Sequence, residues 1–87
     1  MVNRARGIIK SVHSEEQRVF YDLMIEVRKG ADLTQEKLAK RLKRPQSFIA
    51  KYEGGERRLD VVEFVAVARA IGADPMEILR TLLRRTR

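Results

Sequence analysis

Side chains suited to binding a negatively charged partner gather in the middle of the chain. Between positions 37 and 58 there are eight basic residues and two acidic ones, so this segment carries +6, whereas the other 65 residues together carry +1. A merely soluble protein usually intersperses charges of both signs, so such localisation is typical of a face that binds a polyanion. The sequence therefore favours a binding protein with a basic face.

Few residues in the same sequence could catalyse a reaction. There is one histidine, His13, no cysteine, and no pair of carboxylates in a glycine-framed segment. His13 directly precedes a helix cap and is better explained as a surface residue than as a ligand or base. We therefore expect neither an enzyme nor a bound metal or cofactor.

The composition is that of one small folded domain. Of the 87 residues, 44% are hydrophobic and 36% charged, which is enough apolar surface to offset the entropy of ordering the chain. Without cysteine, neither a disulfide nor a cysteine-based zinc site supports the core, which leaves oligomerisation for that role. No stretch approaches the roughly 18 apolar residues of a membrane span, and no long apolar run follows the basic N-terminus. We expect no membrane partner and a cytoplasmic location.

Five short helices without strands are expected, because apolar residues recur at helical spacing between capping residues and glycines. The expected helices cover residues 15–29, 35–42, 45–52, 61–71, and a stretch from 75 into the basic tail. The expected N-caps are Ser14, Thr34, Asp60 and Asp74. Pro45 and Pro75 are expected at first helical positions, and Gly30 and Gly72 at left-handed stops. The helix over 61–71 is apolar almost all round, as a central buried helix would be.

The chain divides into a basic N-terminal arm (1–13), an all-α domain (14–84) and a basic tail (85–87). In the arm, Arg4, Arg6 and Lys10 suit a minor groove or a row of phosphates. The alternative is that the arm is disordered, as terminal basic segments often are.

The helices expected over 35–42 and 45–52 form the informative pair. Two short helices joined by a tight turn and flanked by positive charge have the layout of a helix-turn-helix. In that motif the second helix enters the major groove of DNA while the first lies across the backbone.

Three segments of the chain resemble the phage repressor/Cro-like family known as XRE. They are LTQEKLAKRL at 33–42, PQSFIAKYEGG at 45–55 and GADPMEIL at 72–79. The resemblance runs from about Ser14 to Leu83, nearly the whole chain. It implies a compact five-helix, lambda-repressor-like domain and sequence-specific binding of double-stranded DNA.

The resemblance also implies roles for individual residues. Gln35 would contact the phosphate backbone and brace the second helix, on which Gln46, Ser47 and Lys51 would face base edges. Glutamine suits adenine and lysine suits guanine. Phe48 would touch a thymine methyl or a sugar, or alternatively pack on the domain.

Phosphate contacts are expected on both sides of the second helix. The residues are Lys43, Arg44, Arg57 and Arg58, with a solvated charged loop as the alternative. Two of the neighbouring positions depart from the family pattern. Lys43 stands where glycine is common, so we expect it to adopt positive φ at a cost of about 1 kcal/mol. Pro45 stands where a capping serine or threonine is common, which removes a side-chain cap.

The last helix carries more apolar surface than one short terminal helix usually buries. Its apolar residues are Ile78, Leu79, Leu82 and Leu83. We expect them to form a homodimer interface, with closure of the monomer core as the alternative. The resulting hypothesis is a homodimeric transcriptional regulator, most often a repressor by resemblance, on a pseudo-palindromic operator. An antitoxin that represses its own operon is the alternative, and it would bring a toxin or other regulator as protein partner.

Overall fold

The computed structural model describes residues 14–87 and contains, in that part of the chain, five α-helices and no β-strand. The helices are α2 (Glu15–Gly30), α3 (Gln35–Leu42), α4 (Gln46–Glu53), α5 (Val61–Ile71) and α6 (Pro75–Arg85). The expected all-α fold with five helices is therefore confirmed. The arm at 1–13, with Arg4, Arg6, Lys10 and His13, lies outside the described residues.

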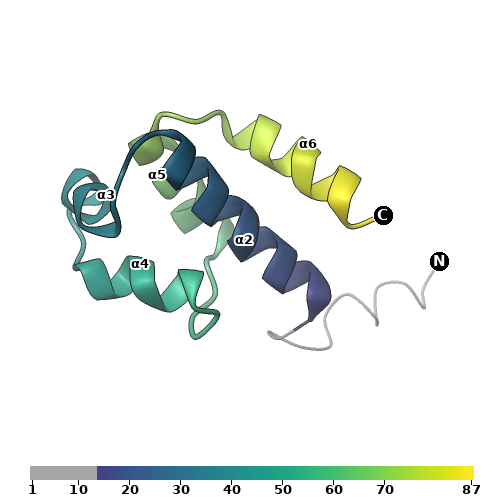
Figure 1. Cartoon of the computed structure of the whole chain (residues 1–87), viewed down its shortest axis with the longest axis horizontal. Helices are drawn as coiled ribbons and strands as arrows, with labels where there is room; N and C mark the ends of the chain where they lie inside the picture. Colours follow the sequence, from purple (N-terminus) through teal and green to yellow (C-terminus); the bar gives the residue numbers. More distant parts are fainter. Residues whose placement is uncertain (1–13) are drawn as a thin grey trace.

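The helices form two groups, which are joined by α5 and by direct packing of α2 against α4. Figure 1 shows α2 crossing the molecule with α6 alongside it, whereas α3 and α4 form the opposite end. Helix α5 lies behind α2 in this view and contacts both α3 and α6. None of the helices within 14–87 combines the length and the apolar character needed to cross a bilayer.

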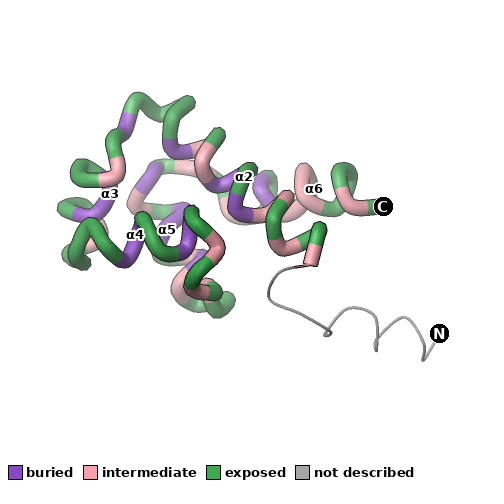
Figure 2. The backbone as a smooth tube through the Cα atoms, turned by 60° about the horizontal axis from the view of Figure 1, so that its bottom comes forward, coloured by how far each residue is buried: buried purple, intermediate pink, exposed green. Residues whose placement is uncertain are grey.

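The core draws on all five helices. Met24, Leu38, Ile49, Tyr52 and Val67 are completely inaccessible to solvent. Aromatic rings pack around them, with Phe20 edge-on to Phe64 and Phe48 edge-on to Tyr52. Figure 2 shows the buried positions turned inward along each helix, with exposed positions on the outer faces. This core fixes the angle at which α3 and α4 leave the rest of the domain.

The expected N-caps are confirmed. The side chains of Ser14, Thr34 and Asp74 accept hydrogen bonds from the backbone N–H groups of Gln17, Lys37 and Met76, respectively. At α5 the cap is reciprocal. Asp60 Oδ1 accepts from the Glu63 N–H at 2.7 Å, and Glu63 Oε1 accepts from the Asp60 N–H at 3.0 Å. A capping box of this kind satisfies two N–H groups that a helix start would otherwise leave unpaired.

The turn between α3 and α4 has the strained residue that the sequence indicates. Lys43 adopts left-handed geometry with φ 58° and ψ 43°, and its N–H still donates to Lys40 O. The backbone before a proline avoids helical geometry, so Arg44 cannot continue α3. Pro45 itself is the N-cap of α4, with ψ 151°, rather than its first helical residue. The expected start of this helix was therefore wrong by one residue, because proline fixes φ but leaves ψ free for the extended value of a cap.

Two other helix features differ from expectation. Gly30 is the last residue of α2, and the left-handed position falls instead on Asp32 with φ 59°. Aspartate tolerates this region better than most residues. Val61 and Val62 are 70% and 74% exposed, so the first turn of α5 is not buried all round. Helix α6 runs into the basic tail, as expected, and ends at Arg85, which forms two hydrogen bonds to Glu26 at 2.9 and 3.1 Å.

Candidate nucleic-acid interface

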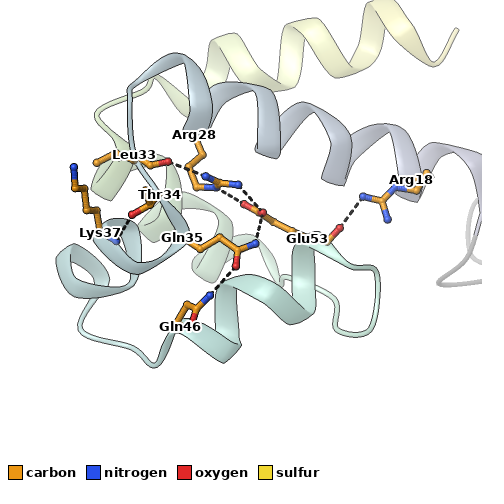
Figure 3. Close-up of polar contacts among 8 residues, drawn as sticks. All are labelled: Arg18, Arg28, Leu33, Thr34, Gln35, Lys37, Gln46 and Glu53. Carbon is orange, nitrogen blue, oxygen red and sulfur yellow. Dashed lines mark hydrogen bonds and ion pairs between the residues drawn. The ribbon is translucent and has the colours of Figure 1, made fainter.

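A chain of side-chain hydrogen bonds connects the core to the start of α4 (Figure 3). Arg28 donates to both carboxylate oxygens of Glu53, from Nε at 2.7 Å and from Nη2 at 3.0 Å. Glu53 Oε1 also accepts from Gln35 Nε2 at 2.8 Å. Gln35 Oε1 in turn accepts from Gln46 Nε2 at 3.0 Å. The exposed side chain of Gln46 is therefore oriented, through Gln35, by a buried ion pair.

The ion pair also holds α4 against α2. Arg28 and Glu53 are both buried, and Arg28 Nη1 donates to Leu33 O at 2.7 Å. Arg18 Nη2 donates to the backbone oxygen of Glu53 at 2.8 Å. The hydrogen bonds to Glu53 raise the pKa of Arg28 above its ordinary value. Because a buried charge without its partner is costly, this pair fixes the end of α4 in one position.

The buried pairing of Arg28 with Glu53 was not predicted from the sequence. A signal was present, because Tyr21, Met24 and Arg28 lie at helical spacing on the buried face of α2. An arginine on an apolar stripe is almost never buried unless it is paired.

The outer face of α4 carries the three side chains expected to read bases. Gln46, Ser47 and Lys51 are exposed, together with Ala50, while the next positions around the helix are buried. Residues four apart share a helix face, so Gln46 lies beside Ala50 and Ser47 beside Lys51. The structure thus brings the expected base-contact residues together on one accessible surface.

Phe48 belongs to the core side of α4. Its side chain is buried, with 7% of its surface exposed, and its ring lies edge-on to Tyr52 with centroids 5.7 Å apart. The guanidinium carbons of Arg44 and Arg57 lie 4.1 and 4.8 Å from the ring centroid. Phe48 therefore packs on the domain, and contact with a base or sugar would have to pass these two arginines.

The expected phosphate-contact residues flank α4 at both ends. Lys43, Arg44 and Arg58 are exposed, and Gln35 is half-buried at the N-terminus of α3. Arg57 differs, because both of its Nη atoms donate to Glu63, at 2.9 and 2.8 Å. Arg44 Nη2 lies 3.9 Å from the same carboxylate. The hydrogen bonds from Arg57, followed by the Asp60 N–H, lower the pKa of Glu63 from its ordinary 4.5 to about 2.

The expected dimer residues of α6 separate into two groups. Ile78 is 4% exposed and packs in the core of its own chain, which fits the alternative that this residue closes the monomer core. Leu79 and Leu82 are half-buried, and Leu83 is 68% exposed. Leu79 and Leu82 line an apolar groove of about 380 Å³ with Phe20, Leu59, Val61 and Phe64. We call this the α5–α6 groove.

Comparison with known proteins agrees with this geometry. The "Helix-turn-helix domain" family matches residues 24–82. The solved structure of an XRE-family like protein from Pseudomonas syringae pv. tomato str. DC3000 is 44% identical, with a TM-score of 0.82, over 98% of this chain and 99% of that chain. The chain belongs to the XRE family of helix-turn-helix proteins. As an XRE-family protein it is a DNA-binding regulator of transcription.

Two further structures share the fold of this XRE-family chain. A point mutant of the restriction-modification controller protein C.Esp1396I has a TM-score of 0.76 at 18% identity, over 83% of this chain and 91% of that chain. The restriction-modification controller protein C.AhdI from Aeromonas hydrophila has a TM-score of 0.63 at 29% identity, over 68% of this chain and 89% of that chain. A search of curated proteins finds no match.

Proposed function

We propose that the protein is a repressor that binds a pseudo-palindromic DNA operator as a homodimer. The observation that carries the proposal is the hydrogen-bonded chain from Arg28 through Glu53 and Gln35 to Gln46. It presents one exposed face of α4 in a fixed orientation, with basic residues before and after the helix. A helix presented in this way can enter a major groove about 12 Å wide.

Base contacts in this proposal come from Gln46, Ser47 and Lys51. Gln46 keeps free polar atoms beyond its bond to Gln35, and a glutamine amide pairs with adenine N6 and N7. Lys51 is exposed one turn beyond Ser47 and suits guanine O6 and N7. Phosphates would be held by Gln35, Lys43, Arg44, Arg57 and Arg58. Phe48 would act through the arginines that cover it rather than touch DNA.

The α5–α6 groove supports the homodimer. Val61, which lines the groove, is 70% exposed, and the residues that follow groove residues in sequence, Val62 and Leu83, are 74% and 68% exposed. A two-fold contact along Leu79, Leu82 and Leu83 would cover them in two copies at once. Two recognition helices related in this way would read half-sites about 34 Å apart.

Selection of bound sites from random duplex DNA tests the proposal. We expect a recovered sequence with two inverted half-sites, bound by two protein chains as measured by light scattering. Binding that prefers no duplex over bulk DNA would overturn sequence-specific repression. A preferred but unpaired half-site, bound by one chain, would overturn the homodimer.

Repression and the antitoxin alternative need tests in the cell. Transcription from a promoter that overlaps the selected site should fall when the protein is expressed in the cytoplasm, and a rise would overturn repression. Copurification of the product of an adjacent gene in a stable complex would favour the antitoxin alternative, whose partner would compete for the same exposed apolar surface.

A further inference from the structure

Glu63 is an acidic residue set among the basic side chains that flank α4. It is the third residue of α5, and its side chain is about 20% exposed. Its two oxygens accept from Arg57 Nη1 at 2.9 Å and Nη2 at 2.8 Å. Arg44 is within ion-pair distance at 3.9 Å. Within residues 14–87 no comparable pairing is found for Lys43, Lys51 or Arg58.

Three of the five N–H donors of Arg57 are already used, two of them by Glu63. A guanidinium has five N–H groups. Two of those of Arg57 bind Glu63, and a third binds the backbone oxygen of Arg58 at 2.9 Å. A DNA phosphate would therefore meet an arginine whose charge is already balanced and whose bidentate edge is already occupied. The carboxylate would also repel the phosphate directly.

The charge of Glu63 persists under all ordinary conditions. With its pKa lowered to about 2 by Arg57 and the Asp60 N–H, the side chain stays ionised throughout the neutral range. The same oxygen that binds Arg57 accepts from the Asp60 N–H, so the capping box holds the carboxylate in place. Glu63 is thus a fixed counter-charge rather than a flexible neighbour.

We propose that Glu63 is an internal counter-ion that limits the affinity of the protein for DNA phosphates. The proposal rests on the docking of α4 described above. Protein side chains gain affinity from DNA by releasing the cations condensed on it, and a neutralised arginine releases fewer of them. Removing the Glu63 charge should therefore strengthen binding to every duplex alike and leave the preferred sequence unchanged, because Glu63 lies away from the base-reading face of α4.

Glu63→Gln is the sharpest test. Glutamine also serves as the third residue of a capping box, so the start of α5 should remain intact. The slope of the logarithm of affinity against the logarithm of salt concentration should become steeper by about 0.9 for one additional counterion released. At 0.1 M salt this corresponds to roughly eightfold tighter binding. The gain should shrink by about 3.5-fold between 50 and 200 mM salt. Affinities for the selected operator and for bulk duplex would be measured by fluorescence anisotropy across that range.

Glu77→Gln is the matched control. Glu77 is the third residue of α6, is exposed, and pairs with Arg80, so its replacement removes the same charge from the same helix position away from α4. It should leave the salt slope unchanged. Glu63→Ala gives a second measurement without the glutamine amide and should produce the same gain as Glu63→Gln. Melting curves would set a temperature at which all variants are folded.

A double-variant comparison assigns the gain to the arginine. In an Arg57→Gln background, Glu63→Gln should yield a clearly smaller gain than in the parent protein. Unchanged or weaker binding by Glu63→Gln, or a full gain without Arg57, would overturn the inference. If the parent protein itself shows no preference for any duplex, the proposed function fails instead, and the two failures are distinguishable.

Discussion

Gln46 donates a hydrogen bond to Gln35 at 3.0 Å across the turn between α3 and α4, and Gln35 donates to the buried Glu53 at 2.8 Å. The first residue of α4 is thereby oriented from the first residue of α3. Recognition by Gln46 should consequently depend on a residue outside α4.

Replacing either glutamine should alter the same part of the operator. Gln46→Ala should remove the preference for adenine at one position of each half-site, at a cost of about 1–3 kcal/mol. Gln35→Ala should weaken the preference at that same position, since it frees the Gln46 amide to rotate. The two losses should be less than additive in a double-mutant cycle measured by operator titration. If Gln46→Ala left the preferred sequence unaltered, the assigned face of α4 would be wrong.

Removing a charge from the buried ion pair should lower the free energy of unfolding far more than removing a charge from an exposed loop. Glu53→Gln leaves Arg28 charged and unpaired in the interior, so the free energy of unfolding should fall by about 3–5 kcal/mol. Glu56→Gln, on the exposed loop three residues later, is the control and should shift stability by less than about 0.5 kcal/mol. Adding Arg28→Met to Glu53→Gln should recover part of the loss. Urea unfolding measures all three, and equal effects of the two glutamines would contradict the assignment.

Tyr52 and Tyr21 allow the effect of a buried hydroxyl on the free energy of unfolding to be compared with and without a hydrogen-bond partner. Tyr52 Oη has no hydrogen-bond partner among the described residues, and burial raises the pKa of this side chain. Tyr52→Phe should therefore leave the free energy of unfolding unchanged or raise it by up to about 1 kcal/mol. Tyr21 Oη accepts from the Leu59 N–H at 3.3 Å, so Tyr21→Phe should lower it by about 0.5–1.5 kcal/mol. A larger loss for Tyr52→Phe than for Tyr21→Phe would show that the Tyr52 hydroxyl is satisfied in solution.

Acid should weaken the fold partly through Glu63. Its pKa is about 2 in the folded chain, below the ordinary value of 4.5, so the carboxylate stabilises the folded state above pH 4.5. This contribution is lost as the pH falls from about 4.5 toward 2. Glu26, whose pKa is lowered by Arg85, acts in the same direction, so the Glu63 share is the difference between the parent protein and Glu63→Gln. Melting temperatures measured from pH 6 to 2 should fall less steeply for the variant, and parallel curves would contradict the prediction.

Self-association should depend on Leu83 more than on its neighbours. Leu83→Glu replaces an exposed apolar side chain by a charged one at the position after the groove residue Leu82, so it should shift a dimer to monomer without unfolding the chain. Leu83→Met keeps the volume and apolar character, and should leave the dimer intact. Sedimentation over a range of protein concentrations measures both variants. If Leu83→Glu associates like the parent protein, the subunit contact lies elsewhere.

Local features of this fold could be predicted from sequence because they depend on neighbouring residues. The capping serine, threonine and aspartates act within three positions. The left-handed geometry of Lys43 was expected from the resemblance, because glycine is common at this position in the family. The expected start of α4 at Pro45 was wrong by one residue, because the φ of proline suits both an N-cap and a first helical position.

Contacts between distant segments could not be predicted in the same way. Arg28 and Glu53 are 25 residues apart, and only packing of α2 against α4 brings them together. Ile78 and Leu83 look alike in sequence, yet one is covered by the core and the other faces out. Glu63 follows the expected cap Asp60 by three positions, but its pairing with Arg57 depends on how the loop before α5 folds back.

The ring of Phe48 gives two long, flexible side chains a fixed resting place. Arg44 and Arg57 both lie on it, one from the turn before α4 and one from the loop after it. A free arginine gives up about 1.5–2 kcal/mol of rotamer entropy when it is immobilised on a ligand. Side chains that are already ordered in the free protein have lost much of that rotamer entropy during folding, so less is lost on binding. In the proposed complex, a single buried aromatic residue would thereby prepare the arginines on both sides of α4 for the same DNA backbone.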